Sequence, residues 1–194
     1  MPGKRADETG CRARGARHRG RMASAPTLPF KISVLVFLRD ASGRHLLIRR
    51  AKAPNLGCWS PVGGKLEMAQ GESPFECAVR EVAEETGHAI AERDLHLFGM
   101  VSERGYEGAG HWLMFLFDCH KPIAGLPADI DEGRFALHTR AEIDALAVPE
   151  TDRTLLWPVW DKHRSSFLAY RAECHPDTPL RMTVEESHLR PHLG

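Results

Sequence analysis

Continuous apolar runs of strand length divide the middle of the chain. Residues 31–38 (KISVLVFL) and 45–49 (HLLIR) flank a turn at 40–43 (DASG), which predicts a β-hairpin. Residues 95–102 and 112–119 (WLMFLFDC) predict two further strands. The second is the most apolar run of the chain, so it should lie at the centre of a sheet.

Helical spacing marks residues 74–86, where the apolar stripe recurs at i, i+3, i+4, i+7 and i+11. Ser73 suits the N-cap, Glu76 completes a capping box, and Gly87 is a typical C-terminal stop. The stripe should therefore face a core and leave the rest of the helix surface free.

The C-terminal half predicts a short strand at 134–137, a short helix at 140–146 and a longer helix at 151–164. Pro158 should kink or split the longer helix, because proline removes a backbone donor. The two longer helices and about six or seven strands in mixed order predict an α+β fold, a mixed β-sheet between helices.

One domain accommodates this pattern, and a composition of 42% hydrophobic and 27% charged residues is typical of a soluble globular protein. Residues 1–27 are basic and offer little to bury, which predicts a disordered N-terminal extension. Residues 28–166 form the predicted domain. Residues 167–194 are predicted to be a tail that is ordered at most in part, with one packed element around 167–170.

Charge and cysteine usage narrow the class of protein. The formal net charge is zero, and the arginines of the extension have no interleaved aromatic residues, which disfavours a nucleic-acid-binding arm. A transit peptide, or Met22 as the natural start, are open alternatives for this segment.

No run approaches the roughly 18 apolar residues of a membrane span. The five cysteines show no C-x-x-C pattern, which argues against a disulfide framework and a structural zinc site and favours the cytoplasm.

Three glutamates should converge beside the apolar stripe of the predicted helix. Glu81 precedes Glu84 by three and Glu85 by four residues, the spacing of neighbours on a helix surface. A solvated acidic face is the simpler alternative, since like charges cost only about 0.2–0.5 kcal/mol per pair. Arg80 inside the cluster and the glycine loop at 63–64 favour a metal site instead. Convergent carboxylates predict a hard divalent cation, Mg²⁺ or Mn²⁺ before Zn²⁺.

This segment resembles the Nudix box, G-x5-E-x7-R-E-U-x-E-E-x-G-U, where U is a bulky apolar residue. The matching positions after the first glycine are Glu72, Arg80, Glu81, Val82, Glu84, Glu85 and Gly87. There are two departures, a two-residue insertion between Gly64 and Glu72, around 68–70, and His88 at the last apolar position. Neither removes an expected ligand, and the resemblance extends over about residues 30–164.

The resemblance implies an α/β/α Nudix sandwich and metal-dependent cleavage of a pyrophosphate linkage in a nucleoside diphosphate joined to another group. By position, the metal ligands are Glu81, Glu84, Glu85 and the backbone carbonyl of Gly63. The resemblance gives Glu72 a supporting role in the loop and toward a further ion, and it gives Arg80 the role of fixing one carboxylate. The ions would neutralise the diphosphate and activate a water for in-line attack.

Substrate contacts are predicted from residue type alone. The candidates are Arg49, Arg50 and Lys65 for phosphate, and Trp59, Tyr106 and Trp112 for stacking on a base. Surface charge explains the cations equally well, and core packing is the commoner role of aromatic side chains near a sheet. The loop at 129–132 offers Glu132 as proton acceptor, with a solvated acidic turn as the alternative.

The expected partner is a small nucleotide, either a nucleoside triphosphate, a dinucleoside polyphosphate or a nucleotide sugar. No membrane partner is expected, and a homodimer stays open. A non-catalytic Nudix-like nucleotide sensor is one alternative function. An enzyme similar to isopentenyl diphosphate isomerase is another, although neither Cys58 nor Cys77 stands in the context that such an enzyme needs.

Overall fold

A five-stranded mixed sheet forms the centre of the molecule in the computed structural model, which describes residues 29–188. Its strand order is β1-β5-β4-β7-β8, and β1/β5 and β4/β7 are parallel whereas the other pairs are antiparallel. These strands are β1 (Phe30–Phe37), β5 (Gly110–Cys119), β4 (Leu95–Tyr106), β7 (Phe167–Glu173) and β8 (Arg181–His188). The predicted central position of β5 is confirmed, because it lies between β1 and β4.

A second, antiparallel sheet contains β3 (Trp59–Ser60), β2 (His45–Arg50) and β6 (Gly133–His138). The predicted hairpin is therefore wrong, since its two strands belong to different sheets. Only the turn itself closes, through an Arg39–His45 bridge and a 2.9 Å hydrogen bond from the Leu46 N–H to the Leu38 carbonyl. Both strands bury residues on two faces, so their apolar pattern does not specify a pairing partner.

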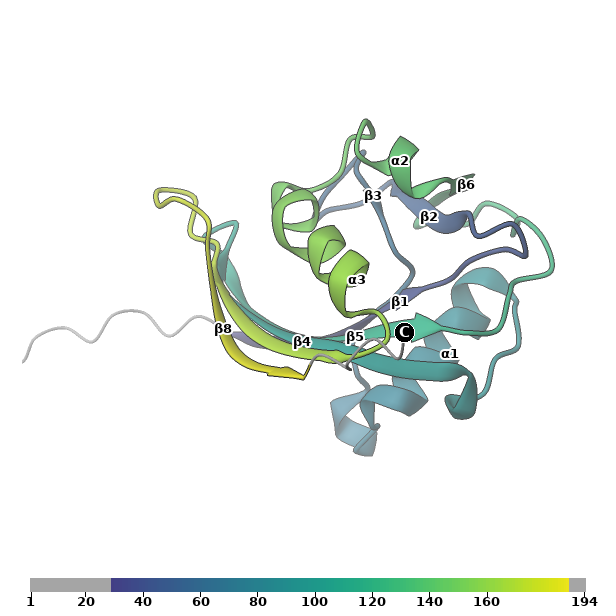
Figure 1. Ribbon diagram of the computed structural model, residues 1–194, viewed down its shortest axis with the longest axis horizontal. Helices are drawn as coiled ribbons and strands as arrows, with labels where there is room; N and C mark the ends of the chain where they lie inside the picture. The colour runs from purple at the N-terminus through teal and green to yellow at the C-terminus, as the bar shows by residue number, and fades with distance from the viewer. Residues whose placement is uncertain (1–28, 189–194) are drawn as a thin grey trace, which may run out of the picture.

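Helices cover both faces of the five-stranded sheet. Figure 1 shows α1 (Pro74–Thr86) and α3 (Trp157–His163) on opposite sides of it. The other helical segments are α2 (Arg140–Ile143), the short 3₁₀ turns η1 (Met68–Gln70) and η2 (Glu92–Asp94), and the π-helical η3 (Asp152–Leu156). No helix among the described residues is long and apolar enough to cross a membrane.

Alternating side chains of β1 divide the core between the two helical layers. Val34 and Val36 lie in one buried cluster with Val82 of α1. Phe37 points to the opposite cluster, where its ring meets Trp157 of α3 edge-on at 5.0 Å. Each such burial contributes about 1.5–3 kcal/mol. The arrangement confirms the predicted α/β/α sandwich around a mixed sheet.

Proline interrupts the helix before α3 as the sequence predicts. The chain is helical from residue 150 to 163, but the Trp157 N–H bonds to the Asp152 carbonyl, five residues back. Pro158 follows in the first turn of α3, where its missing donor is tolerated. The π turn accommodates the change of hydrogen-bond register, and it brings Asp152 to the start of the altered segment.

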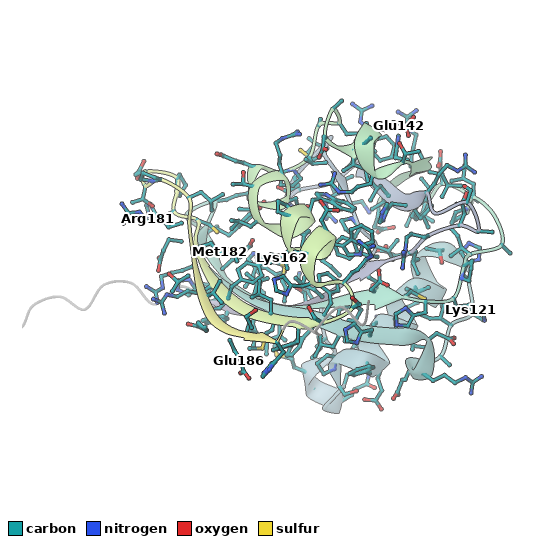
Figure 2. All side chains as sticks on the ribbon, in the orientation of Figure 1. Lys121, Glu142, Lys162, Arg181, Met182 and Glu186 are labelled. Carbon is teal, nitrogen blue, oxygen red and sulfur yellow. The ribbon has the colours of Figure 1, made fainter. Side chains whose placement is uncertain are left out.

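The packed element predicted around residues 167–170 is strand β7, but a tail ordered at most in part is wrong for residues 167–188, because a further strand, β8, follows. β7 lies between β4 and β8, and it buries Leu168, Tyr170 and Ala172. Interspersed charges and small residues hide this strand in the sequence. β8 is largely exposed and polar, and Figure 2 shows its labelled side chains Arg181, Met182 and Glu186 at the outer edge of the sheet. The predicted disordered extension lies outside the described residues.

Candidate active site

The local sequence of α1 holds its carboxylate face in place. The Glu76 N–H donates to Ser73 Oγ at 3.2 Å and the Ser73 N–H donates to the Glu76 carboxylate at 2.8 Å, which confirms the predicted capping box. Gly87 ends the helix in the left-handed region with a φ of 68°. Buried Ala78 and Val82 anchor the neighbouring apolar stripe of the helix, which limits rotation of the helix about its axis and so holds the glutamates in place.

Arg80 is the hub of the carboxylate cluster. It binds Glu72 through two hydrogen bonds, Nε to Oε1 at 2.7 Å and Nη2 to Oε2 at 3.0 Å. Its Nη1 donates to Glu81 and to Glu84, each at 2.9 Å. Nη2 also donates to the Lys65 carbonyl at 3.1 Å. One arginine therefore joins the loop to the helix and contacts three carboxylates, where the sequence predicted one.

Glu72 supports the loop that contains the insertion. Hydrogen bonds from Arg80, and one from the Glu67 N–H at 2.7 Å, lower the pKa of Glu72 to about 2. The inserted residues form the turn η1, which ends at Gly71 with a φ of 72°. Met68 in this turn is exposed. The insertion is therefore accommodated at the surface, beside the carboxylates and outside the register of α1.

Glu81 and Glu85 are the half-buried members of the cluster, whereas Glu84 is exposed. Burial is the largest cause of the raised pKa of Glu81, and burial followed by the charge of Glu81 raises the pKa of Glu85 to about 7. Glu85 Oε2 is buried and has no hydrogen-bond partner within residues 29–188. A buried carboxylate oxygen without a donor is the kind of group that a cation stabilises.

The two glycines of the loop allow a close approach to β1 and α1. The Val62 and Gly64 carbonyls accept hydrogen bonds from Val36 and Val34 of β1, at 2.8 and 2.9 Å. The Gly63 carbonyl between them accepts no backbone hydrogen bond in the described part of the chain. A Cβ on Gly64 would lie 2.1 Å from Glu81 Oε1, so only glycine lets the loop pass this carboxylate.

These donors fit a hard divalent cation in their chemistry. Glu81, Glu84, Glu85 and the Gly63 carbonyl are all oxygen ligands, which Mg²⁺ and Mn²⁺ prefer. Within residues 29–188 no three His, Cys, Asp or Glu side chains stand close enough together to hold an ion. Ion pairs of Glu81 and Glu84 with Arg80, both at 2.9 Å, account for the present orientation of those two side chains.

A cavity of about 240 Å³ opens beside the glycine loop. It lies over the α3 side of the sheet, where Leu35 and Met114 line it from β1 and β5. Its cationic side chains are Lys31, Arg50 and Lys65, and its glycines are Gly63 and Gly64. The charge of Arg50 offsets part of the rise in the pKa of Glu85, so this arginine lies near both the cavity and the carboxylates. Anionic groups of a ligand would meet the cations next to the loop.

The structure brings some of the predicted substrate contacts together and separates others. Lys65, Tyr106 and Trp112 line the cavity. Arg49 instead points to the surface, where its Nε donates to the Gly57 carbonyl at 3.1 Å. Trp59 packs edge-on against His138 with ring centroids 4.9 Å apart, and it joins the core cluster under α3.

Glu132 lies near the carboxylate cluster. It forms a 3.1 Å ion pair with Lys52, and its charge contributes to the raised pKa of Glu85. A solvated acidic turn and a proton acceptor both remain compatible with this exposed position, so its role stays a prediction.

Glu103 and Asp152 also line the cavity, and the sequence did not single them out. Glu103 follows Val101 by two residues in β4, so strand alternation places it on the same buried face. A charged residue at an inward position of a strand was the available signal. Asp152 had no comparable signal, because its place depends on the packing of the last helix.

Comparison with known proteins agrees with this site. The NUDIX domain family model matches residues 29–167. An uncharacterized Nudix hydrolase, YvcI of Bacillus subtilis (strain 168), is 30% identical over 104 residues. That alignment covers 53% of this chain and 65% of the relative, so the chain spans less than two thirds of the relative's length.

Two solved structures share the fold. The mutator MutT protein from Bacillus halodurans has a TM-score of 0.62 and 22% identity, with 80% of this chain and 97% of that chain covered. The NUDIX domain of Shewanella oneidensis NrtR, in complex with ADP-ribose, has a TM-score of 0.56 and 15% identity, with 71% and 89% covered. The family model matches most of the chain, and the shared fold agrees with it. The chain therefore belongs to the Nudix family.

Proposed function

We propose that the protein is a metal-dependent hydrolase that cleaves the pyrophosphate linkage of a nucleoside diphosphate joined to another group. One observation carries the proposal, the buried and unpartnered Glu85 Oε2 within a cluster of glutamates that adjoins a cavity lined by cations. Family membership supports hydrolysis of pyrophosphates in general, and Mg²⁺, with Mn²⁺ as the alternative, fits the oxygen ligands.

The carboxylate cluster would bind the cation, and the adjoining cavity would bind the substrate. Glu81, Glu84, Glu85 and the Gly63 carbonyl would hold the cation, which when bound neutralises diphosphate oxygens and lowers the pKa of a water. Arg80 keeps the ligands aimed through its hydrogen bonds to Glu81 and Glu84.

The cavity side of the site would bind the substrate. Lys65 and Arg50 line the cavity and would bind the phosphates against the glycine loop. Glu132, close to Glu85, is the candidate that takes the proton of the attacking water.

The substrate class follows from the neighbourhood of the cluster. The cavity provides Tyr106 and Trp112 for a base and cations for the phosphates, which suits a nucleotide. The ADP-ribose bound by the NrtR domain is itself a nucleoside diphosphate joined to a second group. Nucleoside triphosphates, dinucleoside polyphosphates and nucleotide sugars all belong to this class. A cytoplasmic location stays a prediction.

A nucleotide panel tests the proposal. The full chain with Mg²⁺ should release a nucleoside monophosphate from at least one member, and Glu84→Gln or Glu85→Gln should lower turnover by orders of magnitude. Glu76→Gln is the matched control, because glutamine also completes a capping box and the residue lies outside the carboxylate cluster. Full activity in both cluster variants would contradict the site. Nucleotide binding without turnover in the wild-type protein would support the non-catalytic sensor instead.

A further inference from the structure

Two carboxyl groups that the proposed reaction does not use face the same cavity. Glu103 lies in the middle of the sheet, paired with Trp112 of β5 and Ala172 of β7, and only 6% of its surface is exposed. Asp152 reaches the cavity from the first residue of η3. Helix η3 packs on the face of the sheet from which Glu103 projects, so both groups belong to one wall.

Neither carboxyl group is neutralised by the protein. Among the described residues no donor hydrogen-bonds to the Glu103 carboxyl, and Asp152 accepts one long bond, from Thr151 Oγ1 at 3.4 Å. The cavity's cations form no ion pair with either group within residues 29–188; Lys31 instead lies over the Trp112 ring at 4.8 Å. Glu103 is the buried member of the pair, and a buried charged side chain without a partner is costly, so this wall is incomplete without a ligand.

The two groups also interact with each other. Burial and the charge of Asp152 raise the pKa of Glu103 to about 8, and burial raises the pKa of Asp152 to about 7. Burial is the main cause of the raised pKa of Tyr106 in β4 and of Tyr170 in β7, and the charges of both carboxyl groups add to it. Two carboxyl groups that face one cavity without a cation disfavour each other's ionised form, so one of them retains a proton and acts as a donor while the other acts as an acceptor.

We propose that Glu103 and Asp152 bind the base of the nucleotide and select guanine, which deepens the function proposed above and rests on it. Guanine presents a carbonyl acceptor, a ring N–H and an amino group along one edge. A neutral carboxyl group donates to the carbonyl, and a carboxylate accepts from the ring N–H and the amino group. When the pair shares one proton, its two carboxyl groups can therefore form a hydrogen bond to each of the three polar groups along this edge of guanine.

Other bases satisfy the pair less well. Adenine offers an amino group beside an acceptor nitrogen, which a single neutral carboxyl group satisfies, so the carboxylate would stay buried and unpaired. Uracil places carbonyl oxygens on both sides of its N–H, and one of them would oppose the carboxylate.

The rest of the cavity suits the same orientation. Tyr106 is held by a 2.6 Å hydrogen bond from its hydroxyl to Asn55 Oδ1, so its ring is fixed beside the wall. Gly63, Gly64 and Lys65 also line the cavity, so phosphates can extend from the base toward the carboxylates of α1.

Binding of GDP and IDP in metal-free buffer tests this inference without turnover. The hypoxanthine base of IDP differs from guanine only by the missing amino group. The wild-type protein should bind GDP about 10–100-fold more tightly than IDP, the value of a hydrogen bond to a charged group. Glu103→Gln and Asp152→Asn should each lose most of this discrimination. Glu107→Gln, at the exposed turn after Tyr106, should keep it.

The outcomes separate the two proposals. Equal affinity of the wild-type protein for GDP and IDP would overturn the guanine assignment, and so would unchanged discrimination in either folded variant. Since the wild-type comparison needs no variant, a misfolded variant leaves the test intact. Intact discrimination without hydrolysis of any nucleotide would instead contradict the proposed function and keep this inference.

Discussion

Substitution of Gly64 by alanine should separate catalysis from folding. The new Cβ would lie 2.1 Å from Oε1 and 2.2 Å from Cδ of Glu81. Nonbonded carbon atoms pack about 3.5–4.0 Å apart, so the carboxylate would have to retreat by about 1 Å or more. A displacement of that size at a reacting centre costs about 10²-fold in rate.

The free energy of unfolding of the Gly64→Ala variant should change only slightly compared with the loss in its rate of turnover. The atoms that clash are the far end of a flexible side chain, so the backbone of the loop can stay in place. Glu81 would lose its 2.9 Å hydrogen bond from Arg80, worth about 1.5–3 kcal/mol. Alanine recovers about 0.4–1 kcal/mol by restricting the unfolded chain. The expected net loss is about 1–2 kcal/mol.

Two other glycines provide the comparison. A Cβ on Gly63 would lie 2.1 Å from the backbone oxygen of Val34, which cannot move aside alone. Separating the loop from β1 loses two hydrogen bonds, at 2.8 and 2.9 Å, of about 1 kcal/mol each, and overpacking adds about 1–3 kcal/mol. Gly125→Ala is the control, since nothing lies within 4 Å of its Cβ position.

Urea unfolding and Mg²⁺-dependent turnover of the nucleotide found in the panel should be measured on all three variants. We expect Gly125→Ala to match the wild-type protein, Gly64→Ala to lose turnover, and Gly63→Ala to lose stability. Wild-type turnover in Gly64→Ala would refute Glu81 as a ligand. A stability loss as large as that of Gly63→Ala would refute the distinction between the two clashes.

Two further predictions concern Arg80 and His45. Arg80→Lys cannot reproduce the fork that binds Glu72 at 2.7 and 3.0 Å, so turnover should fall by about 10–100-fold in a steady-state assay. Wild-type turnover in that variant would contradict the positioning role. Burial lowers the pKa of His45 from 6.5 to about 3, so the folded state keeps it neutral while the unfolded chain binds a proton. The free energy of unfolding should therefore fall as pH drops from about 6.5 toward 3, by up to about 5 kcal/mol. Urea titrations should show this slope, and a His45→Phe variant that retained it would contradict the assignment.

Local spacing accounts for what the sequence predicted well. The start and end of α1 and the convergence of Glu81 with its neighbours depend on contacts within a few residues along one helix. Helix geometry is the same in any fold, so these features follow directly from the order of residues. The split at Pro158 has the same origin, because the missing backbone donor is a property of the residue itself.

Strand pairing was less predictable. β1 and β2 follow one another across a tight turn, yet they enter different sheets because their side chains are buried on two faces. β7 carries only short apolar stretches, and its burial depends on β4 and β8 on either side. Neither partner can be identified from the strand's own residues.

The sequence by itself determined the family, the carboxylate helix and the glycine loop, since each rests on short-range spacing. Only the tertiary structure decided what surrounds them. Strand register turned Arg50 rather than Arg49 toward the cavity, and helix packing brought Asp152 to the wall that holds Glu103. The carboxylate cluster is therefore encoded locally. The lining of the cavity depends on residues that are distant in sequence, because only long-range packing places them together.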